Sequence, residues 1–230
     1  MKLNHHLDKR AVMYSASLSW VATPVPGVQR RMLERDGGEM AIRATSVVRY
    51  AAGAEFSEHS HDLGEEFIVL DGVLSDASGD YPRGAYVRNP PGSRHRPFTE
   101  KGCEIFVKLR QIAADDANTV YVDTNTSAWL PTAVEGQWVM PLYRRDGDDP
   151  EYVSLVKWLP DAQIEHPGHS GGEEIFVLEG SFADELGRYP QGTWLRKPPG
   201  SALSAYTCEG CILYVKTGHL QAKSIGQEGC

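Results

Sequence analysis

The feature of this sequence that most limits its fold is an internal repeat, in which one pattern recurs 108 positions later. Residues 61–109 align with residues 169–217 without a gap, and 22 of the 49 aligned residues are identical. Unrelated sequences would share only a few residues over this length. The regularity indicates a duplicated unit, so we expect two similar domains of roughly 100 residues each, an ordinary size for a small domain.

Both copies carry the pattern of short β-strands. Apolar residues alternate with their neighbours at 42–50 and again at 67–71, as expected for strands with one buried face. Turn-forming residues recur at short intervals between them, among 23 glycines and 14 prolines in the chain. This rhythm predicts an all-β fold built from antiparallel sandwiches or jelly-roll barrels.

The repeat and the turn signals also predict how the chain is divided. A proline- and glycine-containing stretch at 22–27 breaks regular structure before the first copy begins. We expect the following parts: an N-terminal arm at 1–20, a first barrel at 21–112, a connecting segment at 113–138, a second barrel at 139–219 and a C-terminal tail at 220–230.

Composition disfavours several classes of protein. A net charge of −8 argues against binding to nucleic-acid backbones or anionic membranes, and no run of residues is long and apolar enough for a membrane helix. The first 19 residues contain His5, His6 and Asp8 and do not resemble a signal peptide. Four cysteines without dense spacing make no disulfide framework. We expect a soluble cytoplasmic protein without direct nucleic-acid or membrane partners.

The first copy contains a set of metal-ligand residues at regular spacing. His59 and His61 are two residues apart, so on a strand both side chains project from the same face. Glu65 follows a turn and can enter the next strand facing the same cavity, and a Pro-Pro-Gly turn can bring His95 inwards. Three imidazoles and one carboxylate suit a divalent first-row metal and leave positions open for water or a ligand.

The second copy keeps only part of this set. His169 and Glu173 remain in register with their counterparts, but Pro167 and Leu203 stand where the first and last histidines should recur. His166 lies one position too early, and regular strand alternation would point it away from His169 unless the strand bulges. We therefore expect the second site to be empty or weak.

Two other residue types recur between the copies. Arg88 and Arg196 share one position, which favours a common structural role, such as a turn or an interdomain ion pair, over substrate binding. Cys103 and Cys211 also recur, and we expect both to be small buried residues. The spacing of Cys208 and Cys211 is used by redox and zinc sites, but only one such pair is present.

The two motifs of the first copy, at 59–72 and 84–95, resemble those of the cupin superfamily. More specifically, the chain is similar over about 20–217 to the ChrR cupin-like family, through Gly64-Glu65-Glu66, Asp80-Tyr81-Pro82, Arg88-Asn89-Pro90-Pro91-Gly92 and their second-copy counterparts. The resemblance implies two tandem cupin barrels (double-stranded β-helices) and a metal held by His59, His61, Glu65 and His95. ChrR-type anti-sigma factors also carry an N-terminal zinc domain with a His-x3-Cys-x2-Cys motif, and no cysteine follows His5 or His6 in that way.

The ligands and the resemblance leave three functions open. The family favours a zinc-binding sensor or regulator related to anti-sigma factors, which would have a protein partner. The same site with Fe(II) or manganese could serve a dioxygenase of small diketones or hydroxyketones. A non-catalytic barrel binding a small ligand is the third. We expect one divalent ion, with zinc first and Fe(II), Mn or Ni as alternatives, and whether the chain is an enzyme or forms homo-oligomers stays open.

Overall fold

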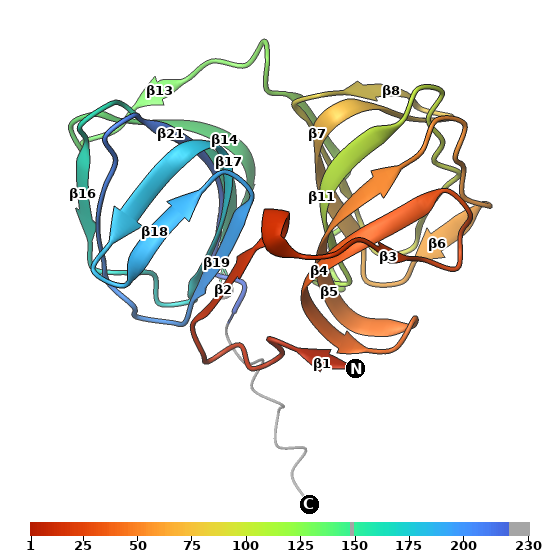
Figure 1. Ribbon diagram of the computed structural model, residues 1–230, viewed down its shortest axis with the longest axis horizontal. Coiled ribbons are helices and arrows are strands. Elements are labelled where there is room, and N and C mark those ends of the chain that lie inside the picture. Colours follow the sequence, from red (N-terminus) through yellow and green to blue (C-terminus); the bar gives the residue numbers. More distant parts are fainter. Residues whose placement is uncertain (148–149, 221–230) are drawn as a thin grey trace, which may run out of the picture.

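The computed structural model describes residues 1–147 and 150–220. Within them the helical structure is one short 3-10 turn, η1 (Ser15–Ser17), and all other regular elements are strands arranged as two barrels side by side (Figure 1). No helix in this part of the chain is long and apolar enough to span a membrane. The prediction of an all-β fold with two tandem barrels is confirmed.

The first barrel combines one large sheet with a small two-stranded one. The large sheet has the order β1-β4-β5-β11-β7-β9-β12, with β3 paired to β4 and β8 paired to β7, and the small sheet pairs β10 with β6. The strands are β1 (Lys2–Leu3), β3 (Val21–Ala22), β4 (Val28–Gly37), β5 (Ala41–Tyr50), β6 (His59–His61), β7 (Glu65–Asp76), β8 (Gly79–Pro82), β9 (Ala85–Asn89), β10 (Ser93–His95), β11 (Cys103–Leu109) and β12 (Val120–Asp123).

The second barrel repeats this plan. Its main path is β13-β14-β15-β21-β17-β19-β2, with β18 paired to β17, and with β16 paired to β20. The strands are β2 (Ala11–Tyr14), β13 (Leu130–Pro131), β14 (Gln137–Arg145), β15 (Glu151–Trp158), β16 (Gln163–His166), β17 (Glu173–Asp184), β18 (Gly187–Pro190), β19 (Thr193–Lys197), β20 (Leu203–Tyr206) and β21 (Cys211–Thr217).

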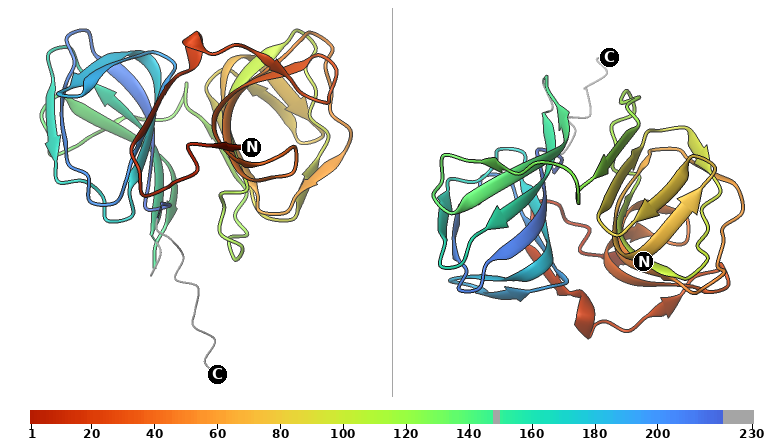
Figure 2. Two further views of the ribbon diagram at one scale, coloured as in Figure 1. Left: turned by 60° about the horizontal axis from the view of Figure 1, so that its bottom comes forward. Right: turned by 90° about the horizontal axis from the view of Figure 1, so that it is seen from above.

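The two barrels exchange their leading strands. β2 precedes the first barrel in sequence but pairs with β19 of the second, whereas β12 precedes the second barrel but pairs with β9 of the first. The exchanged segments are β-prone and in part apolar, Ala-Val-Met-Tyr in β2 and Val-Tyr-Val-Asp in β12. Figures 1 and 2 show the N-terminal segment crossing beside β19 and the connecting segment bridging the barrels. Each barrel is therefore completed by a strand from the other half's sequence.

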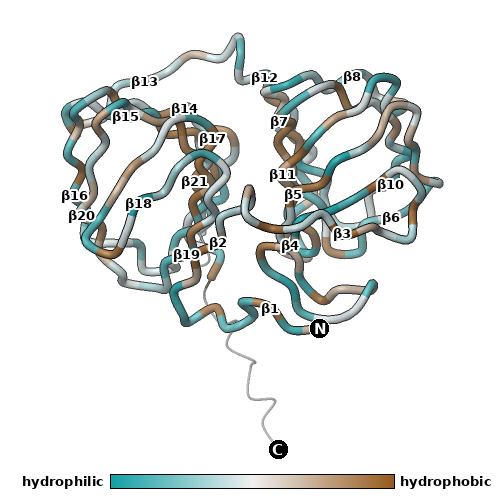
Figure 3. Tube along the Cα trace, in the orientation of Figure 1, coloured by the Kyte–Doolittle hydropathy of each residue, from teal (hydrophilic) through white to brown (hydrophobic). Residues whose placement is uncertain are grey.

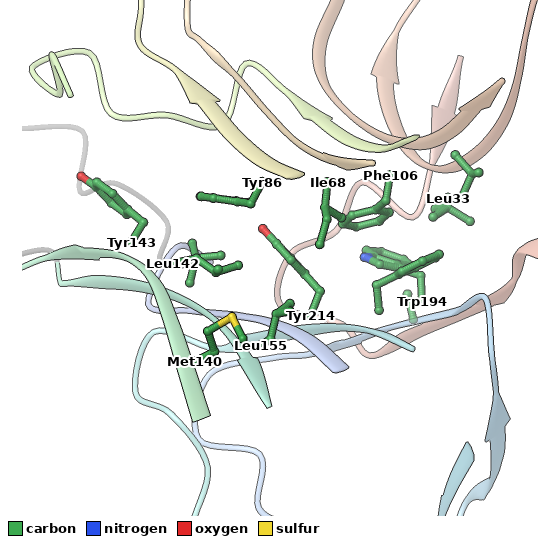
Figure 4. Close-up of a cluster of buried hydrophobic side chains, with 14 residues drawn as sticks. Leu33, Ile68, Tyr86, Phe106, Met140, Leu142, Tyr143, Leu155, Trp194 and Tyr214 are labelled. Carbon is green, nitrogen blue, oxygen red and sulfur yellow. The ribbon is translucent and has the colours of Figure 1, made fainter. Parts of the chain in front are cut away.

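The largest hydrophobic cluster lies between the barrels rather than inside either one. Both halves contribute to it, and Phe106 stacks on Phe176 with ring centroids 4.3 Å apart (Figure 4). Tyr86 and Trp194, which share one repeat position, are both fully buried there. Hydrophobic stretches run along the strands that face each other across the interface, including β11 and β21 (Figure 3). The halves thus form one joined core in addition to the core of each barrel.

Buried ion pairs flank this shared core. Arg88 pairs with Glu66 of its own barrel and with Glu151 Oε1 of the second barrel at 2.9 Å. Arg196 Nη1 pairs with Glu34 Oε2 of the first barrel at 2.8 Å. The predicted interdomain role of the two recurring arginines is confirmed.

The ionisation of the interface follows from these contacts. Burial opposes the charge on Glu66, but Lys216 and Arg88 outweigh burial and lower its pKa to about 2. At the equivalent position, Lys108 overcomes burial and holds the pKa of Glu174 well below its usual range. Charges withdrawn from water in this way depend on their partners, so loss of one partner leaves another charge uncompensated.

Candidate metal centre

The four predicted ligands of the first barrel come together on adjacent strands. His59 and His61 lie on one face of β6, and β10 pairs with β6 so that His95 stands opposite His59. His61 Nε2 lies 2.9 Å from His95 Nε2, and Glu65 Oε2 lies 3.6 Å from the former and 3.5 Å from the latter. The ring of His59 lies 4.8 Å from that of His61 between centroids. A metal held at about 2.1 Å from each donor fits such separations.

Neighbouring groups orient the imidazoles toward a common point. His59 Nδ1 donates to the Ser57 carbonyl at 2.9 Å, and His95 Nδ1 donates to Asp76 Oδ2 at 3.3 Å. With the proton on Nδ1, each ring presents the Nε2 lone pair that a metal requires. Sequence reasoning missed Asp76, because nothing in the local spacing shows that the end of β7 returns to this histidine.

Burial disfavours the charged form of two of the histidines. It lowers the pKa of His61 to about 4, and it lowers the pKa of His95 although Glu65 opposes the shift. Burial also raises the pKa of Glu65, whose Oε2 accepts a bond from Asn89 Nδ2 at 3.4 Å. Neutral imidazoles and one carboxylate form a donor set suited to zinc, Fe(II), manganese or nickel. The residues present therefore fit a divalent metal.

The four side chains line a cavity of about 370 Å³. Its walls include aliphatic side chains such as Val48, Ile105 and Val107, together with Tyr50 and Phe56. Three arginines and several acidic residues also contribute to the lining. The volume is in the range of small-molecule sites, so the candidate centre faces a space that a ligand can fill.

The second barrel corrects one expectation about His166. It does not point away: a ligand atom of His166, of His169 and of Glu173 all lie within 4.8 Å of one another. The physical reason is register. His59 pairs with His95 in the first barrel, and a slip of one residue makes His166 pair with Leu203, the position equivalent to His95. The slip places His166 where strand alternation had excluded it.

The protonation of this second cluster nevertheless differs from the first. The backbone N–H of Gly168 donates to His166 Nδ1 at 3.1 Å, so in the neutral ring the proton lies on Nε2, which faces Glu173 Oε1 at 3.6 Å. Lys197 occupies the position of Asn89 and lies 3.4 Å from Glu173 Oε2. A protonated ring nitrogen and an ammonium both disfavour a metal, so the expectation of an empty or weak second site stands as a prediction.

The recurring cysteines are buried as predicted. Cys103 and Cys211 are each 4% exposed, and burial raises their pKa values to about 11 and about 12. Cys208 is exposed, and the three are free thiols. Thiols with raised pKa values are poor nucleophiles and metal ligands, which argues against a reactive role for Cys103 and Cys211. Cys230 lies outside the described residues.

Solved structures share this fold at low sequence identity. Protein YlbA from E. coli is 13% identical, with a TM-score of 0.73 and coverage of 96% of each chain. The pirin YhhW from Escherichia coli, solved with nickel(II), is 15% identical, with a TM-score of 0.64 and coverage of 91% of this chain and 98% of that one. Oxalate decarboxylase from Bacillus subtilis, which has Mn(II) centres, is 12% identical, with a TM-score of 0.61 and coverage of 92% and 78%.

Sequence comparison identifies the family. No curated protein matches the chain significantly. The ChrR cupin-like domain matches it twice in tandem, over residues 8–113 and 117–221. Both matches begin before the exchanged strands β2 and β12, so each family unit includes the strand that it lends to the other barrel. The chain therefore belongs to the ChrR cupin-like family and is a bicupin within the cupin superfamily.

Proposed function

We propose that the first barrel binds one divalent metal ion through His59, His61, Glu65 and His95, and that this metal receives a small molecule in the adjoining cavity. The observation that carries the proposal is the convergence of these four donors on the wall of a 370 Å³ cavity. When bound, a first-row metal supplies Lewis acidity and, as iron or manganese, redox chemistry.

The chain's own residues have definite parts in this proposal. Ser57 and Asp76 hold the protons of two imidazoles on Nδ1, which leaves Nε2 free toward the cavity. Aliphatic residues of β5 and β11 exclude water from the wall facing the donors. A metal with a purely structural role needs no such space, so the cavity favours small-molecule binding, with turnover of an oxygen-rich ligand as the enzymatic form.

A zinc-binding sensor or regulator is the second candidate. The family match supports it, because that family includes the cupin part of ChrR-type regulators. In this form zinc is the resident ion. Modification or loss of one of its protein ligands changes the surface of the barrel, and a protein partner binds according to that change. Zinc as the resident ion and a cytoplasmic location both belong to this proposal.

Elemental analysis separates the candidates. Protein purified without chelator is analysed for zinc, iron, manganese and nickel, and each metal-loaded form is then assayed for oxygen uptake with a β-diketone and a hydroxyketone. Zinc at one equivalent without oxygen uptake supports the sensor, whereas iron or manganese with uptake supports the enzyme. Protein that takes up less than a tenth of an equivalent of every metal contradicts both.

A further inference from the structure

The cavity of the first barrel has a cationic wall that the second barrel lacks. Arg30, Arg35 and Arg110 line the first cavity, whereas the described residues that line the second cavity include no arginine or lysine. Lys197 contacts Glu173 of the second cavity but is not itself part of the lining. By strand pairing, Arg30 opposite Val48 corresponds to Val139 opposite Val156. Arg30 therefore lies at a position where the two copies differ in sequence. The cationic wall occurs in the barrel that has the more complete ligand set.

Arg110 occupies a backbone conformation that an arginine rarely adopts. Its φ is +61°, in the left-handed region, and the second barrel has Gly218 at φ +89° in the same repeat position. The turn is the same in both, since Arg110 N donates to the Gly64 carbonyl at 2.9 Å and Gly218 N donates to the Gly172 carbonyl at 3.1 Å. Glycine makes this turn without strain, so the first barrel retains an arginine at a conformational cost. Such outliers are typical of functional positions.

Two guanidinium donors in this wall also lack acceptors. The Nε atoms of Arg30 and Arg110 are buried and have no hydrogen-bond partner among the described residues. Their terminal nitrogens contact acids that are more than half exposed: Arg110 pairs with Asp62 at 3.2 Å and Arg30 with Glu39. Buried N–H donors without acceptors are costly, which indicates that an acceptor from outside the chain completes them.

We propose that the metal cavity takes a small organic carboxylate, with an oxygen-donor end at the metal and a carboxylate received by Arg110. The inference rests on the proposed metal site and specifies its ligand class. A planar guanidinium matches a carboxylate in geometry and charge, and a divalent ion balanced by Glu65 alone leaves the site positive. Aliphatic residues also line the cavity that contains both ends, which suits a short carbon spacer.

Calorimetric titration of the metal-loaded full chain tests this assignment. The probes are L-malate, which carries a hydroxyl-carboxylate end and a second carboxylate, and malamide, its uncharged diamide. Cobalt(II)-loaded protein also reports by its absorption spectrum whether the probe reaches the metal. We expect saturable malate binding with a spectral change, and malamide binding at least tenfold weaker. Equal affinity for both probes would overturn the proposal.

The variant Arg110→Gly installs the residue that the second barrel uses. It is expected to raise the melting temperature of the protein, to leave metal content unchanged and to weaken malate binding at least tenfold. Arg110→Lys should recover part of that affinity. Arg144→Gln, which removes an exposed charge on β14, is the matched control and should change none of these values.

The failures are distinguishable. Wild-type protein without a stoichiometric metal contradicts the proposed function itself. A stoichiometric metal with malate affinity that is unchanged in Arg110→Gly contradicts only the role of Arg110 and the ligand class. A lower melting temperature in Arg110→Gly overturns the inference as well, because it assigns Arg110 a structural role through Asp62.

Discussion

The two barrels hold histidines around an equivalent glutamate, yet their pockets differ in the hydrogen bond that Nδ1 of one imidazole makes. In the first, His59 Nδ1 donates to a carbonyl, so Nε2 is a free donor atom. In the second, His166 Nδ1 accepts a backbone N–H, so Nε2 carries the proton. A slip of one residue thus kept the imidazole in place and changed its chemistry. The comparison teaches that the same residue types at similar distances can present different atoms to a metal, depending on the hydrogen bonds behind them.

The largest expected effect tests which pocket holds the ion. His95→Ala removes one of the four proposed ligands and should lower metal affinity by more than about a hundredfold, because the remaining donors no longer enclose the ion. Glu173→Ala, in the second pocket, should leave metal content nearly unchanged. Metal content per chain after dialysis, measured by elemental analysis, decides between them. Equal loss in both variants would contradict the difference between the pockets.

The next effect concerns the stability of the interface between the two barrels. Glu66 follows the proposed ligand Glu65 on β7 but faces the second barrel, where it is 1% exposed beside Arg88 and Lys216. Glu66→Ala removes the carboxylate that these two cations share and leaves Glu151 as their only common acid among the described residues. The buried positive charge is then incompletely balanced, and the free energy of unfolding should fall by about 3–5 kcal/mol. Urea unfolding gives this value. The variant Glu55→Ala, at an exposed position, is the control. If Glu66→Ala destabilises the protein no more than Glu55→Ala does, the interface charges are not coupled.

Removal of an orienting group should have an intermediate effect. Asp76→Asn weakens the hydrogen bond that holds the proton of His95 on Nδ1, and metal affinity should fall by about 10- to 100-fold. The repeat offers a control: Asp184, at the same position of the second barrel, accepts a bond from Tyr189 as Asp76 does from Tyr81, but it pairs with no histidine among the described residues. Competition with a coloured chelator measures both affinities. A similar loss in Asp184→Asn would mean that Asp76 acts on folding, not on the metal site.

The smallest effect is on pH dependence. Burial lowers the pKa of His219, and that of His61, to about 4 from 6.5. The unfolded chain therefore binds protons that the folded one resists, so metal-free protein should lose stability as the pH falls from 6.5 toward 4. His219→Gln, which copies Gln111 of the first half, should make this loss shallower. Urea unfolding midpoints at pH 7.5 and pH 5, measured in the presence of a chelator, give this loss. If the midpoint falls by the same amount in wild type and in His219→Gln, His219 does not contribute to the pH dependence.

Much of this architecture could be predicted from the repeat. The alternation of β5 and the spacing of His59, His61, Glu65 and His95 were enough to predict barrels and a candidate ligand set, because both depend on local periodicity. The partner of β12 could not be predicted, since β-propensity says that 120–123 is a strand without saying which sheet it joins. The predicted orientation of His166 was wrong for a related reason. Strand alternation assumes a register, and the register of β16 against β20 is shifted by one residue relative to the first barrel.

The reciprocal loan of β2 and β12 has a consequence for how the molecule can change. A chain divided near residue 115 yields two pieces that each carry the closing strand of the other, so neither piece is a self-sufficient barrel. A mutation that unfolds one half therefore also removes a strand from the barrel of the other half. The second half has a less complete ligand set but a full cupin frame, and the first barrel is closed by the strand that this half supplies.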